Sequence, residues 1–423
     1  MFTALKTELS SFSFQQRLFI LFAMLSGFLI SAEYAIIRPV SNSLFLTAYG
    51  SSALPFAWIA AVPLNLLIVA LYNQYLPRVG CFKMFVWVAS LAIGIQLFSS
   101  FYIHQFTSLP FLFYLWKEVY IMLMFQQLWS VIHMTVAFKQ ARYLYGLFFA
   151  LGAFGATLGS MVPGFLAVKM GSESLLIATL PIYLLLGLCY YCALKQTKEG
   201  TTLRFYEEKK HTSIEAFVHG VKLIASSRYL LVILLLVIFM QFSSTLIDFQ
   251  FNRFLEAKIR DTDLRTQYTG RILSLVHTIT LSFQLFGSFL FIHYLGVKKT
   301  HLLIPLLLCI NGLAFQCFPL FGVISFAYIS IKSSDFSLFT ILKELLYNPL
   351  KPDEKFRAKA VIDVFAHRSS KALASLLILG LQALFGLQFT SYLNWGGIAL
   401  FLLWMGTVLF FLKEPGAKAA ALD

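Results

Sequence analysis

Apolar residues run along most of the chain in long segments, and polar residues gather in short gaps between them. Each apolar segment is close to the ~20 residues that a helix needs to cross a bilayer. Twelve such segments can be drawn, at 18–40, 53–75, 83–103, 108–135, 144–168, 174–195, 228–248, 267–294, 301–322, 324–347, 358–386 and 391–412. The pattern predicts an all-α polytopic membrane protein with twelve transmembrane helices.

The longest polar interruption lies at the middle of the chain and divides the segments six and six. We therefore expect an N-terminal six-helix bundle at 1–195, a cytoplasmic linker at 196–227 and a C-terminal six-helix bundle at 228–423. Apolar residues at helical spacing in 214–224 predict an amphipathic helix on the membrane surface within the linker. The connection 249–266 is charged, and we expect it to be the largest extracytoplasmic feature.

The two halves repeat one local feature. Gly80 is followed by Lys83 between the second and third segments, and Gly296 is followed by Lys298 between the eighth and ninth. A parallel six-plus-six repeat predicts such an echo. The two loops resemble, in degraded form, the cytoplasmic loop signature of the major facilitator superfamily, which implies a major facilitator-like fold.

Composition narrows the class further. Of 423 residues, 59% are hydrophobic and 12% are charged, which excludes an ordinary soluble domain. The net charge of +14 is explained first by basic loops on the cytoplasmic side, with both termini cytoplasmic, and second by attraction of an anionic substrate. The N-terminal segment has no signal-peptide cleavage site, so we expect the first helix to be retained.

The strongest chemical signal is a set of ionisable residues within 341–375. They are Lys343, Glu344, Asp363, His367, Arg368 and Lys371. An unpaired ion at bilayer depth costs at least ~2.5–3.5 kcal/mol, so these groups are expected to pair or to line a water-filled path. On an α-helix, Asp363, His367 and Lys371 fall on one stripe with Arg368 beside it. The alternative is mutual neutralisation within helix packing.

Charged residues in the first half are fewer. Glu33 and Arg38 lie five residues apart in the first segment, and either pair loosely or each face a central cavity, with snorkelling of Arg38 as the alternative. Lys117 and Glu118 are adjacent and point about 100° apart on a helix, so they are not expected to share a neighbour. Glu118 is the stronger candidate for a cavity residue.

Three further features concern packing and pairing. Asp248 ends the seventh segment, at the level of Arg38 if the halves repeat. Lys332 and Asp335 lie three residues apart and are expected to neutralise each other. Gly155 and Gly159 share a helix face, which predicts close approach of another helix.

Signatures of enzymes and metal sites were sought in the sequence. It contains no HExxH and no Gly-x-Ser-x-Gly, and Cys189 and Cys192 lie in an apolar run without histidine. We therefore expect no enzymatic activity, no cofactor and no metal.

Several stretches, in order along nearly the whole chain, carry a second resemblance. They are 37–38 with 46–53, 113–118, 140–149, 343–350 and 357–371. Together they resemble the non-mitochondrial ATP/ADP translocase family, the nucleotide transporters of plastids and obligate intracellular bacteria.

The resemblance implies roles for particular residues. Glu118 matches an acidic transport residue of the family, Asp248 matches the acidic residue of its seventh helix, and Lys371 matches its late lysine. Where the family has a lysine three residues after Arg38, this chain has Ser41. Implied substrate-binding residues are Arg38, Ser41, Glu118, Asp248, Arg368 and Lys371. Candidates for coupling or gating are Glu33, Asp363, His367, Lys343 and Glu344.

The predicted function is secondary transport of nucleotides, either by exchange or by proton-coupled alternating access. The alternatives are a carrier of another organic anion or phosphorylated metabolite, and a membrane receptor or scaffold that does not transport. We expect a monomer in a bacterial inner membrane, with a small anionic ligand and no nucleic-acid polymer as a partner.

Overall fold

Long helices make up nearly all of the computed structural model, which describes residues 12–135, 138–197, 213–350, 358–359, 361–386 and 389–412. Eight helices in these ranges are long and apolar enough to cross a membrane. Each of the predicted apolar segments overlaps a described helix, and the class of multi-pass helical membrane protein is confirmed. The predicted number of twelve spans stays a prediction.

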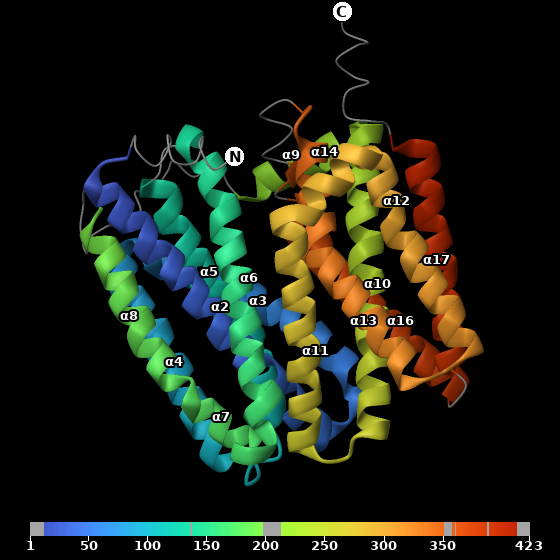
Figure 1. Cartoon of the computed structure of the whole chain (residues 1–423), viewed down its shortest axis with the longest axis horizontal. Helices are drawn as coiled ribbons and strands as arrows, with labels where there is room; N and C mark the ends of the chain where they lie inside the picture. Colours follow the sequence, from blue (N-terminus) through green and yellow to red (C-terminus); the bar gives the residue numbers. More distant parts are fainter. Residues whose placement is uncertain are drawn as a thin grey trace, which may run out of the picture. The chain divides into compact units, whose positions relative to one another are not determined.

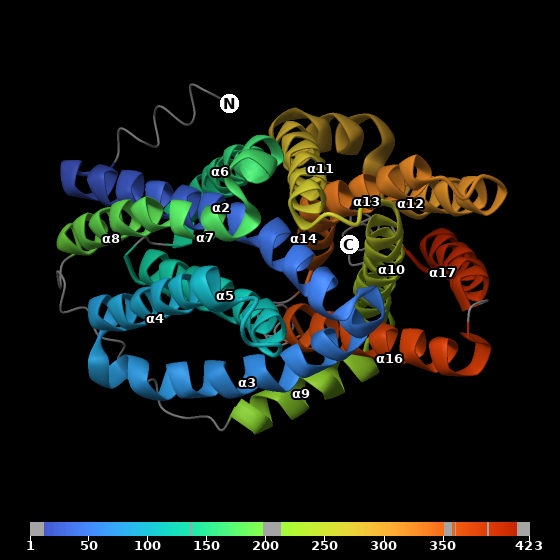
Figure 2. The same cartoon turned by 90° about the horizontal axis from the view of Figure 1, so that it is seen from below.

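The helices pack as two compact units. Unit 1 is built from α2 (Phe14–Tyr49), most of α3 (Leu54–Val79), α4 (Cys81–Tyr102), α5 (Leu109–Thr135), α6 (Phe138–Met170), α7 (Ser172–Ala178), α8 (Leu180–Lys195) and α11 (Thr262–Ser282). Figures 1 and 2 show these helices from two directions.

Unit 2 contains the remaining described helices. These helices are η1 (Ser51–Ala53), the first turns of α3, α9 (Ser213–Ser226), α10 (Arg228–Lys258), η3 (Phe283–Gly287), α12 (Ser288–Cys317), α13 (Phe321–Ser334), η4 (Asp335–Phe339), α14 (Thr340–Tyr347), η5 (Val361–Ala366), α16 (His367–Phe385) and α17 (Phe389–Phe411). Three of them, η3, η4 and η5, are π-helical. The amphipathic helix predicted for 214–224 forms as α9, and the rest of the predicted linker lies mostly outside the described residues. The division into two six-helix bundles stays a prediction.

Local signals in the sequence explain where α2 begins and ends. The Ser13 hydroxyl accepts a hydrogen bond from the Gln16 backbone N–H, and the Gln16 side chain accepts one from the Ser13 N–H, which forms a capping box. Gly50 ends the helix with φ 72°, a conformation that favours glycine. Gly296, with φ 77°, likewise marks the bend within α12, between the predicted eighth and ninth spans.

The charged stretch 249–266 interrupts the helices only briefly, and its expected place as the largest extracytoplasmic feature stays a prediction. α10 continues to Lys258 and α11 begins at Thr262, so most of this stretch is helical. The physical reason is that Phe249, Phe251 and Leu255 are buried among the charged residues. Their burial stabilises the helix beyond the point where the sequence becomes polar.

Close packing of α2 against α6 organises unit 1, and the two helices lie side by side in Figures 1 and 2. A Cβ atom added at Gly155 would clash with the backbone of Phe28, and one added at Gly159 would lie 2.7 Å from the Cα of Ala32. Only glycine allows the two backbones to come this close. The predicted glycine-mediated helix contact is confirmed.

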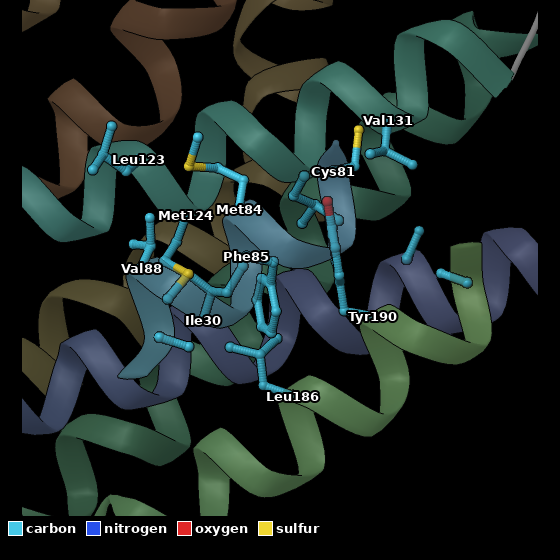
Figure 3. Packing of buried hydrophobic residues seen from close by; sticks show 14 of the residues in the cluster. Ile30, Cys81, Met84, Phe85, Val88, Leu123, Met124, Val131, Leu186 and Tyr190 are labelled. Carbon is cyan, nitrogen blue, oxygen red and sulfur yellow. The ribbon is translucent and has the colours of Figure 1, made fainter. Parts of the chain in front are cut away.

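The apolar core of unit 1 fills the space among α2, α4, α5 and α8 (Figure 3). The Phe85 ring stacks on the Tyr190 ring with centroids 4.3 Å apart, and Ile30 and Met124 lie in the same cluster. This core fixes the positions of the four helices, and therefore of the polar side chains that they carry between them.

Candidate functional site

A buried ion pair joins α10 and α13 in unit 2. The Lys332 Nζ lies 3.0 Å from Asp248 Oδ2 and donates to the Ser244 hydroxyl at 3.0 Å. Lys332 is 8% exposed, so its charge depends on these partners. The sequence predicted a pair between Lys332 and Asp335. Instead, the direct ion pair of Lys332 is with Asp248, and Asp335 accepts from the Gln241 amide at 3.3 Å.

Two more ion pairs follow in the same unit. The Lys343 Nζ lies 3.0 Å from Asp363 Oδ1, which also accepts a hydrogen bond from the Tyr347 hydroxyl at 3.3 Å. The Glu344 carboxylate accepts from Lys359 Nζ at 2.6 Å. Asp363 and Glu344, two of the three carboxylates proposed for coupling or gating, are therefore paired with lysines, which lowers the cost of placing them among apolar helices.

The π-helical segments change the spacing of these charges. Asp335 begins η4 and Asp363 lies in η5, where hydrogen bonds span five residues instead of four. The predicted stripe of Asp363, His367 and Lys371 assumed 3.6 residues per turn, whereas Asp363 lies in η5, where the turn is wider, so the stripe stays a prediction. Asp363 pairs with Lys343, while the His367 side chain is exposed. Short π-helices occur often at functional sites.

Lys371 and Arg368 lie on α16. The Lys371 ammonium lies 5.3 Å from the centre of the Trp58 ring, a cation–π contact within unit 2. Both side chains are half-buried, and Trp58 is buried. Among the described residues, no carboxylate lies within ion-pair distance of Lys371, so its charge is available to an anion.

In unit 1, Lys117 and Glu118 of α5 pair with each other. The Lys117 Nζ lies 3.1 Å from Glu118 Oε1 and 3.5 Å from the centre of the Tyr114 ring. The two adjacent residues meet because the long lysine side chain bends around the helix to reach the carboxylate, and the expectation that they do not share a neighbour stays a prediction. Lys117 is buried and Glu118 is half-buried.

Arg38 and Ser41 follow on α2. Arg38 is half-buried and interacts electrostatically with His277 of α11, a neighbour that sequence reasoning missed. Ser41 is fully buried, and its hydroxyl has no hydrogen-bond partner among the described residues.

Glu33 lies at the centre of a hydrogen-bond network among four helices. Its carboxylate accepts from the Gln96 amide at 2.8 Å, from the Tyr120 hydroxyl at 2.9 Å and from the Tyr183 hydroxyl at 3.0 Å. The Gln96 carbonyl accepts from Thr179 at 3.0 Å. Sequence reasoning identified Glu33 but missed its partners, although Gln96 stands out as a lone amide in an apolar segment.

The structure therefore places Asp248, Lys343, Glu344 and Asp363 in ion pairs within unit 2, and Glu33 in a separate network within unit 1. The predicted meeting of residues from both halves on one cavity stays a prediction.

Comparison with solved structures identifies the fold. A D-xylose–proton symporter matches with a TM-score of 0.68 and 16% identity, over 94% of this chain and 98% of that protein. The nucleoside transporter NupG matches with a TM-score of 0.62 and 13% identity, over 96% of this chain and all of that one. The predicted major facilitator-like fold is confirmed.

Sequence comparison identifies relatives. A plastidic ATP/ADP-transporter of Solanum tuberosum is 24% identical over 211 residues, and ADP,ATP carrier protein 3 of Rickettsia bellii is 26% identical over 178 residues. These matches cover 45% and 38% of this chain and only 33% and 35% of those proteins. The model of the TLC ATP/ADP transporter family matches residues 320–414. The resemblance predicted from the sequence is thus confirmed, and within this major facilitator-like chain it is residues 320–414 that are similar to the TLC ATP/ADP transporter family.

Proposed function

We propose that the protein is a secondary transporter of nucleotides, ATP and ADP or related nucleoside phosphates, which moves its substrate by alternating access. The observation that carries the proposal is the set of cations inside the segment that matches the TLC transporter model. Lys332 and Lys343 are each paired with a carboxylate there, and Lys371 faces an aromatic ring.

A polyphosphate that leaves water needs cations to replace its hydration. The carboxylates of Asp248 and Asp363 neutralise Lys332 and Lys343. Phosphate groups offer the same charge and more acceptor oxygens, so an arriving nucleotide can exchange with a carboxylate as partner. No carboxylate of the described residues lies within ion-pair distance of Lys371, and Arg368 beside it can bind phosphate through two parallel N–H donors.

Arg38, Ser41 and Glu118 are proposed as further substrate-binding residues. Ser41 supports a second candidate, a carrier of an organic anion with fewer phosphates, because its buried hydroxyl stands where the family has a lysine. A neutral hydroxyl compensates less negative charge than an ammonium. The number of phosphates on the best substrate separates the two candidates.

The membrane and orientation follow from charge and from the relatives. The loops that carry lysine and arginine are proposed to face the cytoplasm of a bacterial inner membrane, with both termini on that side. The relatives are named as transporters and carriers, and we propose no enzymatic activity, no cofactor and a monomeric carrier.

The test is uptake into proteoliposomes preloaded with unlabelled substrate. Labelled ATP, ADP, AMP, NAD and a sugar phosphate are compared, and a nucleotide is expected to be taken up fastest. Lys371→Gln is expected to weaken transport by about tenfold or more, because a charge-assisted hydrogen bond contributes ~1.5–3 kcal/mol.

Lys195→Gln is the matched control, since Lys195 is exposed at the end of α8. Uptake of organic anions without phosphate, together with no uptake of any nucleotide, would support the second candidate. The protein is a receptor or scaffold, and not a carrier, if two results are obtained together. Correctly inserted protein transports no anion, and deletion of α9 abolishes its activity in cells while replacement of the buried charged residues does not.

A further inference from the structure

The Glu33 network differs from every ion pair described above because its partners are neutral. Glu33 is 2% exposed, and four described helices, α2, α4, α5 and α8, contribute to the network. Among the described residues, no lysine, arginine or histidine lies within ion-pair distance of its carboxylate. An ion at bilayer depth without a cationic partner is costly, and such positions are usually functional.

The groups that face Glu33 can serve either protonation state. The Tyr183 hydroxyl accepts from the Gln96 amide at 2.9 Å while it donates to Glu33, so it already acts as both donor and acceptor. The Tyr120 hydroxyl lies 3.1 and 2.9 Å from the two carboxylate oxygens. Hydroxyl hydrogens rotate, so each tyrosine can donate to a carboxylate or accept from a carboxylic acid.

Among the residues that the structure describes, the surroundings of Glu33 contain little else that can titrate. α4 contributes Gln96 and α8 contributes Tyr183, both neutral. α5 contributes Tyr120, whose other electrostatic neighbours are Tyr183 and Tyr34. On the side of α6, backbone packing at Gly155 and Gly159 leaves no space for a side chain.

We propose that Glu33 is a proton-binding site and that transport is driven by proton movement through it. The carboxylate takes up one proton to become a neutral acid, and a tyrosine hydroxyl turns from donor to acceptor. Release of the proton reverses the step. The inference rests on the proposed function, because the free energy of the proton gradient is used to accumulate the transported substrate.

Coupling follows from the position of Glu33 on α2. Its hydrogen bonds join α2 to α4, α5 and α8, and Arg38 lies five residues farther along the same helix. A change in the charge of Glu33 changes which donors and acceptors connect these helices. Proton binding can therefore alter the position of α2, and with it Arg38.

The test uses proteoliposomes that take up the best nucleotide identified above, with and without an inward proton gradient. Wild-type uptake with the gradient should exceed uptake without it, and alkalinisation outside should accompany entry of substrate. In Glu33→Gln the ratio of uptake with the gradient to uptake without it should fall to about one. Glu173→Gln, a carboxylate of α7 that pairs with the exposed His104, should keep the wild-type ratio.

If Glu33→Gln does not fold, Tyr183→Phe tests whether Glu33 binds the proton. It removes one hydrogen bond to the carboxylate, so the pH of half-maximal proton-driven uptake should shift upward. Tyr191→Phe, on the same helix but exposed, should leave this pH unchanged. Two results would refute the proton-binding role of Glu33 and leave the proposed nucleotide transport standing. One is wild-type nucleotide uptake that does not change with the proton gradient, and the other is a Glu33→Gln protein with the wild-type ratio of uptake. Absence of nucleotide transport by the wild type overturns the proposed function instead.

Discussion

Replacing Gly159 by alanine tests the closest helix contact in the protein. The new Cβ would lie 2.7 Å from the Cα of Ala32, whereas ordinary contact begins near 3.4 Å. α2 and α6 must therefore move apart by at least about 0.7 Å, which is 3.4 minus 2.7. The obstructing atoms are the Cα and the carbonyl carbon and oxygen of Ala32, which are all backbone, so no side chain can rotate away.

The change in the free energy of unfolding caused by Gly159→Ala is a balance of two effects. Alanine stabilises a helix by ~1 kcal/mol relative to glycine. Overpacking costs ~1–3 kcal/mol, and more where backbones collide. We expect Gly159→Ala to lower the free energy of unfolding by about 1–2 kcal/mol. Adding Gly155→Ala should cost less than the sum of the single changes, because one separation of the helices relieves both clashes.

The assay is denaturation in mixed detergent micelles, read by tryptophan fluorescence. Gly94→Ala of α4 is the matched control, because nothing lies within 4 Å of its added Cβ, and this variant should be equal to wild type or more stable. A Gly159→Ala protein as stable as the Gly94→Ala protein would refute the close contact. Ala32 adjoins Glu33, so the same variant should also reduce the response of transport to a proton gradient.

Other ion pairs and contacts give predictions of their own. Asp248→Asn leaves Lys332 buried without its partner and should cost ~3–5 kcal/mol in the same denaturation assay, with much of the loss recovered in the double variant carrying Lys332→Met. Asp263→Ala removes two hydrogen bonds from Ser172, of 2.7 and 2.6 Å, and should lower the unfolding free energy by ~1.5–3 kcal/mol; no change would show that water replaces them. Trp58→Leu removes the ring beneath the half-buried Lys371 and should raise the KM for nucleotide severalfold with a smaller change in kcat, measured by initial rates of uptake.

The fold could be predicted because the required information is local. The length of an apolar segment decides whether it spans a bilayer, and the spacing of Gly155 and Gly159 decides that another helix can approach. The end of α10 could not be predicted in this way. Burial of Phe249 and Phe251 depends on helices distant in the sequence, and the charged residues between them gave the opposite signal.

The candidate site was predicted only in its residue types. The charged positions stand out because apolar segments make them rare, but their partners come from other helices. Lys332 pairs with Asp248, 84 positions away, and not with the carboxylate three residues away. A π-turn adds a residue without any change in hydrophobic pattern, so the π-helical geometry around Asp363 could not be predicted from the sequence.

The two units compensate buried carboxylates in different ways, and the difference bears on mechanism. Asp248 and Asp363 are paired with lysines, so an anionic substrate can displace them by offering those lysines its own charge. Glu33 is surrounded by hydroxyls and an amide, and these neutral groups provide no positive charge to attract a phosphate. Among common ligands, the proton is the one that removes the charge of Glu33 without needing space in a packed interior. A carrier with both arrangements can bind a polyanion through one set of residues and respond to pH through the other.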